Sequence, residues 1–116
     1  MKISNPYSPD LDVATAASKF AALGSEQRLQ VLHALVRAGP EGLSIGALGA
    51  RTGITGSTLT HHLRILSAAD LVTQTRQGRS IICAAADYRQ VESLSDYLLR
   101  QCCADAAVCQ KDPDHG

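Results

Sequence analysis

Two short helical segments separated by a glycine turn constrain the fold of this chain more than any other feature. A helix is expected over 45–52, with Ser44 as its N-cap and Gly53 at its end. A second helix is expected over 56–69. Its apolar stripe, at helical spacing, consists of Leu59, Leu63 and Leu66. A short helix, a tight turn containing glycine and a helix with a polar outer face are typical of a helix-turn-helix, here over 44–69.

A β-hairpin is expected directly after this motif. Two runs rich in β-formers lie on either side of Gln77-Gly78 and predict a hairpin over 71–84. Such a hairpin beside a helix-turn-helix forms the wing of a winged helix-turn-helix. The 116 residues are expected to form one domain, mainly α with a two-stranded β wing.

Three further helices are expected around the motif. The first would run over 9–23, where Ser8 and Pro9 are typical of a helix start. The second would begin after Ser25 and end near Gly39. The last would run over 87–103, with Asp87 as its N-cap. With four aromatic residues and no tryptophan, the core must consist of aliphatic side chains, and a dimer would bury more apolar surface.

Charge is distributed unevenly along the chain, although the formal net charge is zero. Residues 51–82 carry four arginines against one aspartate, a net of +3, and residues 84–116 carry a net of −3. Attraction to phosphate depends on the local face rather than on the sum. The middle of the chain is therefore the candidate nucleic-acid surface.

The outer face of the second helix of the motif and the tip of the hairpin supply candidate DNA contacts. Short hydroxyl side chains allow a helix to enter the major groove, and arginine binds phosphate or a guanine edge. Amides at the start of the helix suit a phosphate. The candidates are Thr55, Ser57, Thr58, Thr60, His61, Arg64, Arg76, Gln77 and Arg79. A solvated helix beside a charged hairpin would present the same side chains. His62, next to the leucine stripe, is interpreted as a structural, hydrogen-bonded residue.

Four short segments match a known family as a set. LGSEQRL (23–29) resembles the opening of the second helix in the ArsR/SmtB winged-helix repressors, and TLTHHLRIL (58–66) resembles their recognition helix. Leu71-Val72 and the turn QGR (77–79) are similar to the start and the tip of their wing. Asp70 stands where the family usually carries glycine. The resemblance covers roughly residues 11–100. It implies a homodimer, packed through helices 9–23 and 87–103, that represses transcription from operator DNA until an inducer binds.

Three cysteines, Cys102, Cys103 and Cys109, lie close together near the C-terminus, in a segment (104–116) expected to be a flexible sensor tail. Thiolates select soft ions, and the spacing is too irregular for a zinc finger. Three thiolates suit As(III) or Sb(III). The cluster resembles that of arsenite-sensing family members, which implies an arsenic-resistance repressor. The metal sites of other members are not expected, since 87–103 contains no histidine and 44–53 no cysteine.

The spacing of the three cysteines constrains how one ion could bind them. On a continuous helix Cys102 and Cys109 would be about 10 Å apart. Either 104–108 folds back or the third thiolate comes from the other subunit, and fold-back is the prediction.

Other interpretations of the cysteines remain open. Cys102 and Cys103 could extend the apolar stripe of the last helix as small hydrophobes. Cys102 or Cys103 could form a disulfide with Cys109 in a redox repressor, since adjacent cysteines bridge poorly. Asp105 or His115 could complete a Zn(II) or Cd(II) site.

The sequence predicts neither an enzyme nor a protein outside the cytoplasm. Cys83 and Arg89 have the Cys-x5-Arg spacing of thiol phosphatases and some arsenate reductases, but the loop between them has three alanines and the carboxylate of Asp87. Cys83 is therefore interpreted as a core residue. No signal peptide or membrane span is evident, which predicts a cytoplasmic protein with reduced thiols.

Overall fold

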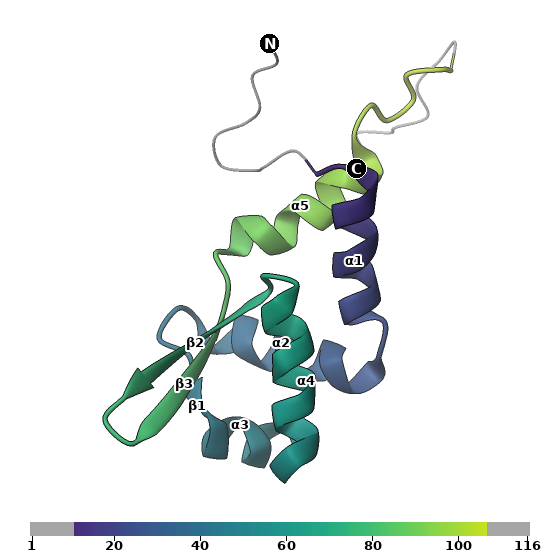
Figure 1. Ribbon diagram of the computed structural model, residues 1–116. Helices are drawn as coiled ribbons and strands as arrows, with labels where there is room; N and C mark the ends of the chain where they lie inside the picture. Colours follow the sequence, from purple (N-terminus) through teal and green to yellow (C-terminus); the bar gives the residue numbers. More distant parts are fainter. Residues whose placement is uncertain (1–10, 107–116) are drawn as a thin grey trace.

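The computed structural model describes residues 11–106 and contains five helices and a small antiparallel sheet (Figure 1). In chain order the elements are α1 (Val13–Leu23), α2 (Glu26–Ala38), β1 (Leu43–Ser44), α3 (Ile45–Thr52), α4 (Gly56–Ala68), β2 (Val72–Gln77), β3 (Ser80–Ala85) and α5 (Tyr88–Leu99). The predicted winged helix-turn-helix is confirmed: α3 and α4 form the motif, and β2 and β3 form the wing.

The sheet has three strands in the order β1-β3-β2. The predicted two-stranded wing is present, and β1, which was not predicted, pairs with the base of β3. The pair Gln77 and Ser80 closes the hairpin, so Gly78 and Arg79 form its turn. The predicted turn, Gln77-Gly78, was wrong by one residue. The shift has a physical reason, because Gly78 takes the positive φ of 62° at the first turn position.

β1 depends on a glycine that allows two backbones to approach closely. Gly42 has a φ of +74°, and a Cβ there would run into the carbonyl oxygen of Cys83. Leu43 and Cys83 are then paired across β1 and β3. This contact attaches the wing to the helix-turn-helix, because β1 leads directly into α3.

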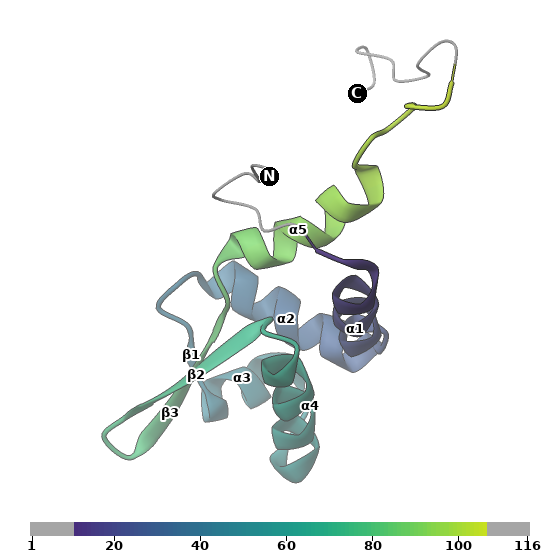
Figure 2. The ribbon, with the colours of Figure 1, turned by 45° about the horizontal axis from the view of Figure 1, so that its top comes forward.

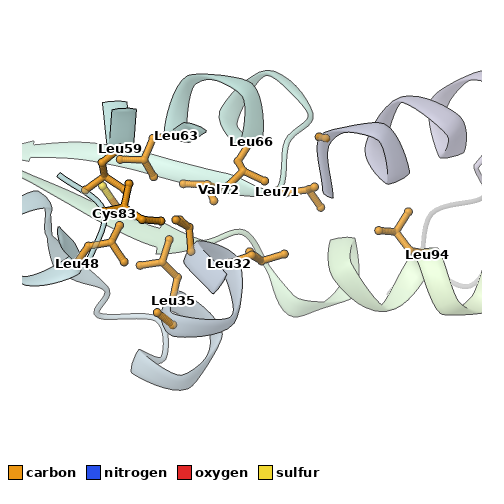
Figure 3. Close-up of a cluster of buried hydrophobic side chains, with 14 of the residues drawn as sticks. Leu32, Leu35, Leu48, Leu59, Leu63, Leu66, Leu71, Val72, Cys83 and Leu94 are labelled. Atoms are coloured by element: carbon orange, nitrogen blue, oxygen red, sulfur yellow. The ribbon is translucent and has the colours of Figure 1, made fainter. Parts of the chain in front are cut away.

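One aliphatic core holds the helices and the wing together (Figure 3). Leu59, Leu63 and Leu66 of α4 are almost fully buried, as the leucine stripe predicted. They pack with buried side chains of α2, α3 and the sheet, including Leu35, Leu48 and Cys83. The stripe therefore fixes which side of α4 faces outward.

α1 begins four residues later than predicted. Leu11 and Asp12 precede the helix, and the Asp12 carboxylate accepts a hydrogen bond from the Thr15 amide at 2.8 Å. Asp12 is thus the N-cap, and the prediction of a helix over 9–23 was wrong at its start; Ser8 and Pro9 lie outside the described residues. Aspartate and serine are both preferred N-cap residues, so the local sequence does not decide whether the helix begins after Ser8 or after Asp12.

α5 ends at Leu99, before the cysteines, and the predicted helix over 87–103 was wrong at its end. Arg100 is extended, and Gln101 and Cys103 have φ values of 62° and 67°. The Arg100 guanidinium donates to the carbonyl of Leu11 at 3.1 Å. This contact joins segments 89 residues apart, so helical periodicity alone could not reveal it.

Within residues 11–106, none of the helices has the length and apolar character that a membrane span requires.

Candidate nucleic-acid interface

The outward side of α4 and the wing carry all nine residues predicted to contact DNA. Each of the nine is exposed: Thr55, Ser57, Thr58, Thr60, His61, Arg64, Arg76, Gln77 and Arg79. Figures 1 and 2 show that the start of α4 lies at the end of the molecule farthest from α5, and that the wing projects to one side of it. Six of these residues lie on α4 or at its N-cap, and the other three lie in the wing. Three of the nine are arginines, one on α4 and two in the wing.

The N-terminus of α4 differs from those of the other four helices. The side chains of Asp12, Ser25, Ser44 and Asp87 each accept a hydrogen bond from a first-turn amide of their own helix. Thr55, the N-cap of α4, makes no such bond. The first amides of α4 are orphan donors at the positive end of the helix dipole, and an anion satisfies such donors well.

His62 joins α4 to the start of α2 instead of facing outward. Its side chain is 8% exposed, and its Nε2 lies 2.8 Å from Gln27 Oε1. Its Nδ1 lies 3.4 Å from Nη1 of Arg28. A guanidinium can only donate, so Nδ1 accepts and Nε2 donates to Gln27, which assigns the neutral tautomer. The interpretation of His62 as a structural residue is confirmed.

The surroundings of His62 favour its neutral form. Burial lowers the pKa of His62 below its ordinary value, and the charges of Arg28 and His61 lower it further. Neutral His62 keeps an acceptor for Arg28, whereas protonation would place a donor against a donor.

Sequence analysis did not single out Lys19 or Arg28, and both contact the ends of helices. Lys19 is 5% exposed and its ammonium lies 2.5 Å from the carbonyl of Ala69, at the C-cap of α4. The Arg28 Nε donates to the carbonyl of Ala22 at 2.5 Å. One signal was available in the sequence: Lys19 falls between Ala16 and Ala22 at helical spacing, on the buried face of α1.

The described part of the cysteine cluster is a pair of sulfurs in contact. Cys102 is exposed and Cys103 is half-buried, and their Sγ atoms are 3.3 Å apart. Both lie in successive turns after α5, where the Cys102 amide donates to the carbonyl of Leu99 at 2.9 Å. Cys109 and His115 lie outside the described residues. Among residues 11–106, no group of three or more His, Cys, Asp or Glu side chains could hold a metal ion.

Cys83 is a core residue, as predicted, and its surroundings do not form a phosphate-binding loop. Its side chain is fully buried, and burial raises the pKa of its thiol, although Gln74 partly opposes this effect. A buried, protonated thiol is a poor nucleophile. Arg89 makes an ion pair with Asp87 at 3.2 Å, so its charge is directed to a carboxylate and not to an anion above Cys83.

Comparisons with known proteins agree with this geometry. A family model described as a helix-turn-helix domain matches residues 23–75. The nodulation protein NolR of Rhizobium meliloti is 34% identical over 70 residues, which cover 60% of this chain and 55% of NolR. The chain therefore spans little more than half of that relative's length.

Two solved structures extend the similarity beyond the motif. An ArsR-like transcriptional regulator from Rhodococcus is 29% identical, with a TM-score of 0.63 over 79% of this chain and 82% of that one. The protein Mb0332 of Mycobacterium bovis, described as a homodimeric winged helix-turn-helix DNA-binding domain, is 25% identical, with a TM-score of 0.61 over 80% and 81%. The chain is thus a winged helix-turn-helix protein similar to ArsR-type transcriptional regulators.

Proposed function

We propose that this protein is a cytoplasmic, homodimeric repressor of an arsenic-resistance operon. It would bind operator DNA through α4 and the wing, and leave it when As(III) or Sb(III) binds the thiolates of Cys102, Cys103 and Cys109. The observation that carries the DNA-binding half is the set of nine exposed polar and basic residues on α4 and the wing.

The geometry of α4 supports the DNA-binding role. The hydroxyl side chains on its outer face are small enough for the helix to enter a major groove. Arg64, on the same face, would contact a guanine edge or a phosphate. The amides behind Thr55 would bind a backbone phosphate. Arg76 and Arg79, at the tip of the wing, would bind phosphate or the minor groove beside the main contact.

Exposed apolar side chains on α1 and α5 support the homodimer. Val13 and Phe20 of α1 are 69% and 37% exposed, and Leu98 and Leu99 of α5 are 67% and 66% exposed. α1 and α5 pack against each other in the monomer, so these side chains belong to neighbouring surfaces. Mb0332, which shares the fold, is described as a homodimer. A second copy would bury this apolar surface.

The thiol pair supports the sensing role. Two sulfurs 3.3 Å apart can both contact one ion, and thiolate sulfur is the donor that soft ions select. Because α5 ends at Leu99, Cys102 and Cys103 lie on turns and are not held at helical spacing. In this proposal the segment 104–108 would fold back toward them. Cys109 would supply the third thiolate, and each binding thiol would release its proton.

Operator binding in the presence of inducer tests this proposal. Fluorescence anisotropy of a duplex selected by the protein from a random pool would be recorded with a reductant, and arsenite, Zn(II) or Cd(II) would be titrated in. Arsenite is expected to release the DNA from wild type but not from Cys109→Ser. Cys83→Ala is the matched control, since it removes a thiol and leaves all three tail thiols in place.

The other outcomes each have a defined meaning. Release that persists in Cys109→Ser would indicate a dithiol site, suited to methylated arsenicals. Release by Zn(II) or Cd(II) but not by arsenite would indicate a metal sensor. DNA binding that does not respond to any of these ions would contradict the sensing half and leave the DNA-binding half intact.

A redox repressor is the second candidate, favoured by the exposure of the Cys102 thiol. Cys102 or Cys103 would form the disulfide with Cys109, because adjacent cysteines bridge poorly. Neighbouring thiols oxidise readily when one of them is a thiolate. Thiol counting after oxidant treatment, beside operator binding, separates the two candidates. Loss of two thiols together with DNA release, and no response to arsenite, would favour the redox function.

A further inference from the structure

From the hydrogen bonds of Lys19 and Arg28 we infer that both are positioning residues. They attach the recognition helix α4 to α1 and thereby influence the affinity of the protein for DNA. This inference rests on the proposed function, because it takes α4 as the helix that reads DNA. Both side chains bind groups within the protein: Lys19 donates to the carbonyl of Ala69, and Arg28 donates to the carbonyl of Ala22. Each joins α1 to α4 at a different point along the two helices.

Lys19 acts at the C-terminal end of α4. Its ammonium donates to the carbonyl of Ala69 at 2.5 Å, and only 5% of the residue is exposed. The last carbonyls of a helix lack partners within the helix and carry the negative end of its dipole. A buried cation at this position therefore satisfies an orphan acceptor and holds the end of α4 against the middle of α1.

Arg28, in the first turn of α2, acts at the C-terminal end of α1. Its Nε donates to the carbonyl of Ala22, in the last turn of α1, and its Nη1 lies 3.4 Å from Nδ1 of His62 in α4. The planar guanidinium can hold two acceptors in fixed directions, which an ammonium cannot. Arg28 thus links the end of α1 to the middle of α4.

Mostly small side chains lie between α1 and α4, so the hydrogen bonds of Lys19 and Arg28 have more influence on the relative position of the two helices. A shallow hollow of about 390 Å³ lies between α1 and α4. Its lining is mostly small side chains: Ser18, Ala21, Ala22, Ile65, Ala68 and Ala69. Figures 1 and 2 show α1 beside the end of α4 that leads into β2.

Operator affinity and its salt dependence test the inference with wild-type protein and two matched pairs of variants. Lys19→Met keeps the length of the side chain but removes the donor, and Lys19→Arg restores a donor. Arg28→Met removes both links, and Arg28→Lys keeps the charge with one link. The methionine variants are expected to bind the selected duplex about 3- to 30-fold more weakly, and Lys19→Arg to recover most of the loss.

The salt dependence separates positioning from direct contact with DNA. Loss of a phosphate contact lowers the slope of log K against log salt by about 1, as expected for Arg64→Ala. Lys19→Met and Arg28→Met should leave this slope unchanged, because neither residue contacts a phosphate. A reduced slope in Lys19→Met would overturn the inference.

Amide hydrogen exchange on the free protein tests the attachment without DNA. In both methionine variants the amides of residues 65–69 are expected to exchange faster, and those of α3 and the wing to exchange at the wild-type rate. Uniform acceleration through the whole fold would mean a general loss of stability and would overturn the inference, as would unchanged exchange in α4.

The failure of the proposed function is distinguishable from the failure of this inference. If Arg64→Ala weakens operator binding and the methionine variants do not, the DNA-binding proposal stands and the positioning role is wrong. If wild type selects no duplex, the DNA-binding proposal fails, and faster exchange confined to α4 would still support its attachment to α1.

Discussion

Asp70 holds a backbone conformation that most residues avoid. It lies between α4 and β2 with a φ of 63°, in the left-handed region that favours glycine. Its amide donates to the carbonyl of Ser67 at 3.0 Å, which ends the helix in a tight turn. The structure thereby explains why glycine is usual at this position in the family that the chain resembles.

Replacing Asp70 with glycine is expected to stabilise the protein. Asp70→Gly should raise the free energy of unfolding by about 0.5–1 kcal/mol, since a left-handed L-residue costs about 1–2 kcal/mol and aspartate tolerates it better than most. Urea denaturation measures the change. Asp70→Asn should be nearly neutral and Asp70→Ala destabilising. A stable alanine variant would show that the turn carries no strain.

His62 should make stability depend on pH. Burial, with Arg28 and His61, lowers its pKa in the folded protein relative to about 6.5 in the unfolded chain. The unfolded chain therefore binds the proton more readily. The contribution of His62 to stability is present above about pH 6.5 and is lost as the pH falls below that value.

Unfolding free energies between pH 7.5 and 5.5 measure this effect. Wild type should lose stability across the range, and His62→Gln should show a shallower slope because glutamine does not titrate. His61→Asn is the matched control, since His61 is exposed, and it should retain most of the slope. Equal slopes in wild type and His62→Gln would assign the titration to other groups.

At the scale of elements, the attachment of the wing depends on β1. A Cβ at Gly42 would meet the Cys83 carbonyl, and its φ of +74° adds strain for any other residue. Gly42→Ala is expected to cost about 3 kcal/mol, the sum of backbone strain and overpacking.

Gly53→Ala is the matched control for this substitution. Gly53 has a φ of +77° in the left-handed region, but a Cβ there would meet nothing within 4 Å. Only the backbone strain remains, so the expected cost is about 1 kcal/mol. Urea denaturation compares the two, and amide exchange at Leu43 reports the pairing of β1 with β3. Equal costs would mean that the strands can separate without loss.

The elements that could be predicted from sequence are those whose signals are local. The leucine stripe of α4 and the caps of α2 and α3 specify those helices without reference to the rest of the chain. The start of α1 and the end of α5 could not be predicted, because Arg100 and Leu11 meet only after folding. β1, only two residues long, exists through its pairing with β3.

The candidate site divides in the same way. The nine outward residues follow from the periodicity of α4 and from the wing, because a buried stripe fixes the opposite face. Lys19 and Arg28 could not be predicted as α4 contacts, since their partners are backbone carbonyls and His62, brought to them by the fold. Burial of a charged side chain is explained by its hydrogen-bond acceptor, and the sequence does not show which acceptor the fold provides.

At the scale of the whole molecule, α1 connects the cysteine turn to the recognition helix. Arg100, two residues before Cys102, donates to the carbonyl of Leu11 at the start of α1. Farther along α1, Lys19 donates to the carbonyl at the end of α4. The carbonyl of Ala22, also in α1, accepts a hydrogen bond from Arg28. In the proposed dimer, a change at the cysteines would therefore alter the position of α4 within one subunit through α1, and between subunits through α1 and α5.

The proposed dimer places the exposed leucines of α5 against the partner, and one substitution tests this. Leu98→Glu should convert the dimer to a monomer, because a buried carboxylate without a partner is costly, while the monomer fold persists since Leu98 is 67% exposed in it. Sedimentation velocity measures the mass. The monomer should also bind a two-half-site operator more weakly, because each subunit reads one half-site.

Leu29→Glu is the control for added charge on an exposed leucine outside α1 and α5, at 52% exposure. It should leave the dimer intact. In wild type the melting temperature should rise with protein concentration, as it does when folding and association are linked, and in Leu98→Glu it should not. A dimer that survives Leu98→Glu, or that Leu29→Glu dissociates, would place the interface on a different face and would leave the cysteine turn outside it.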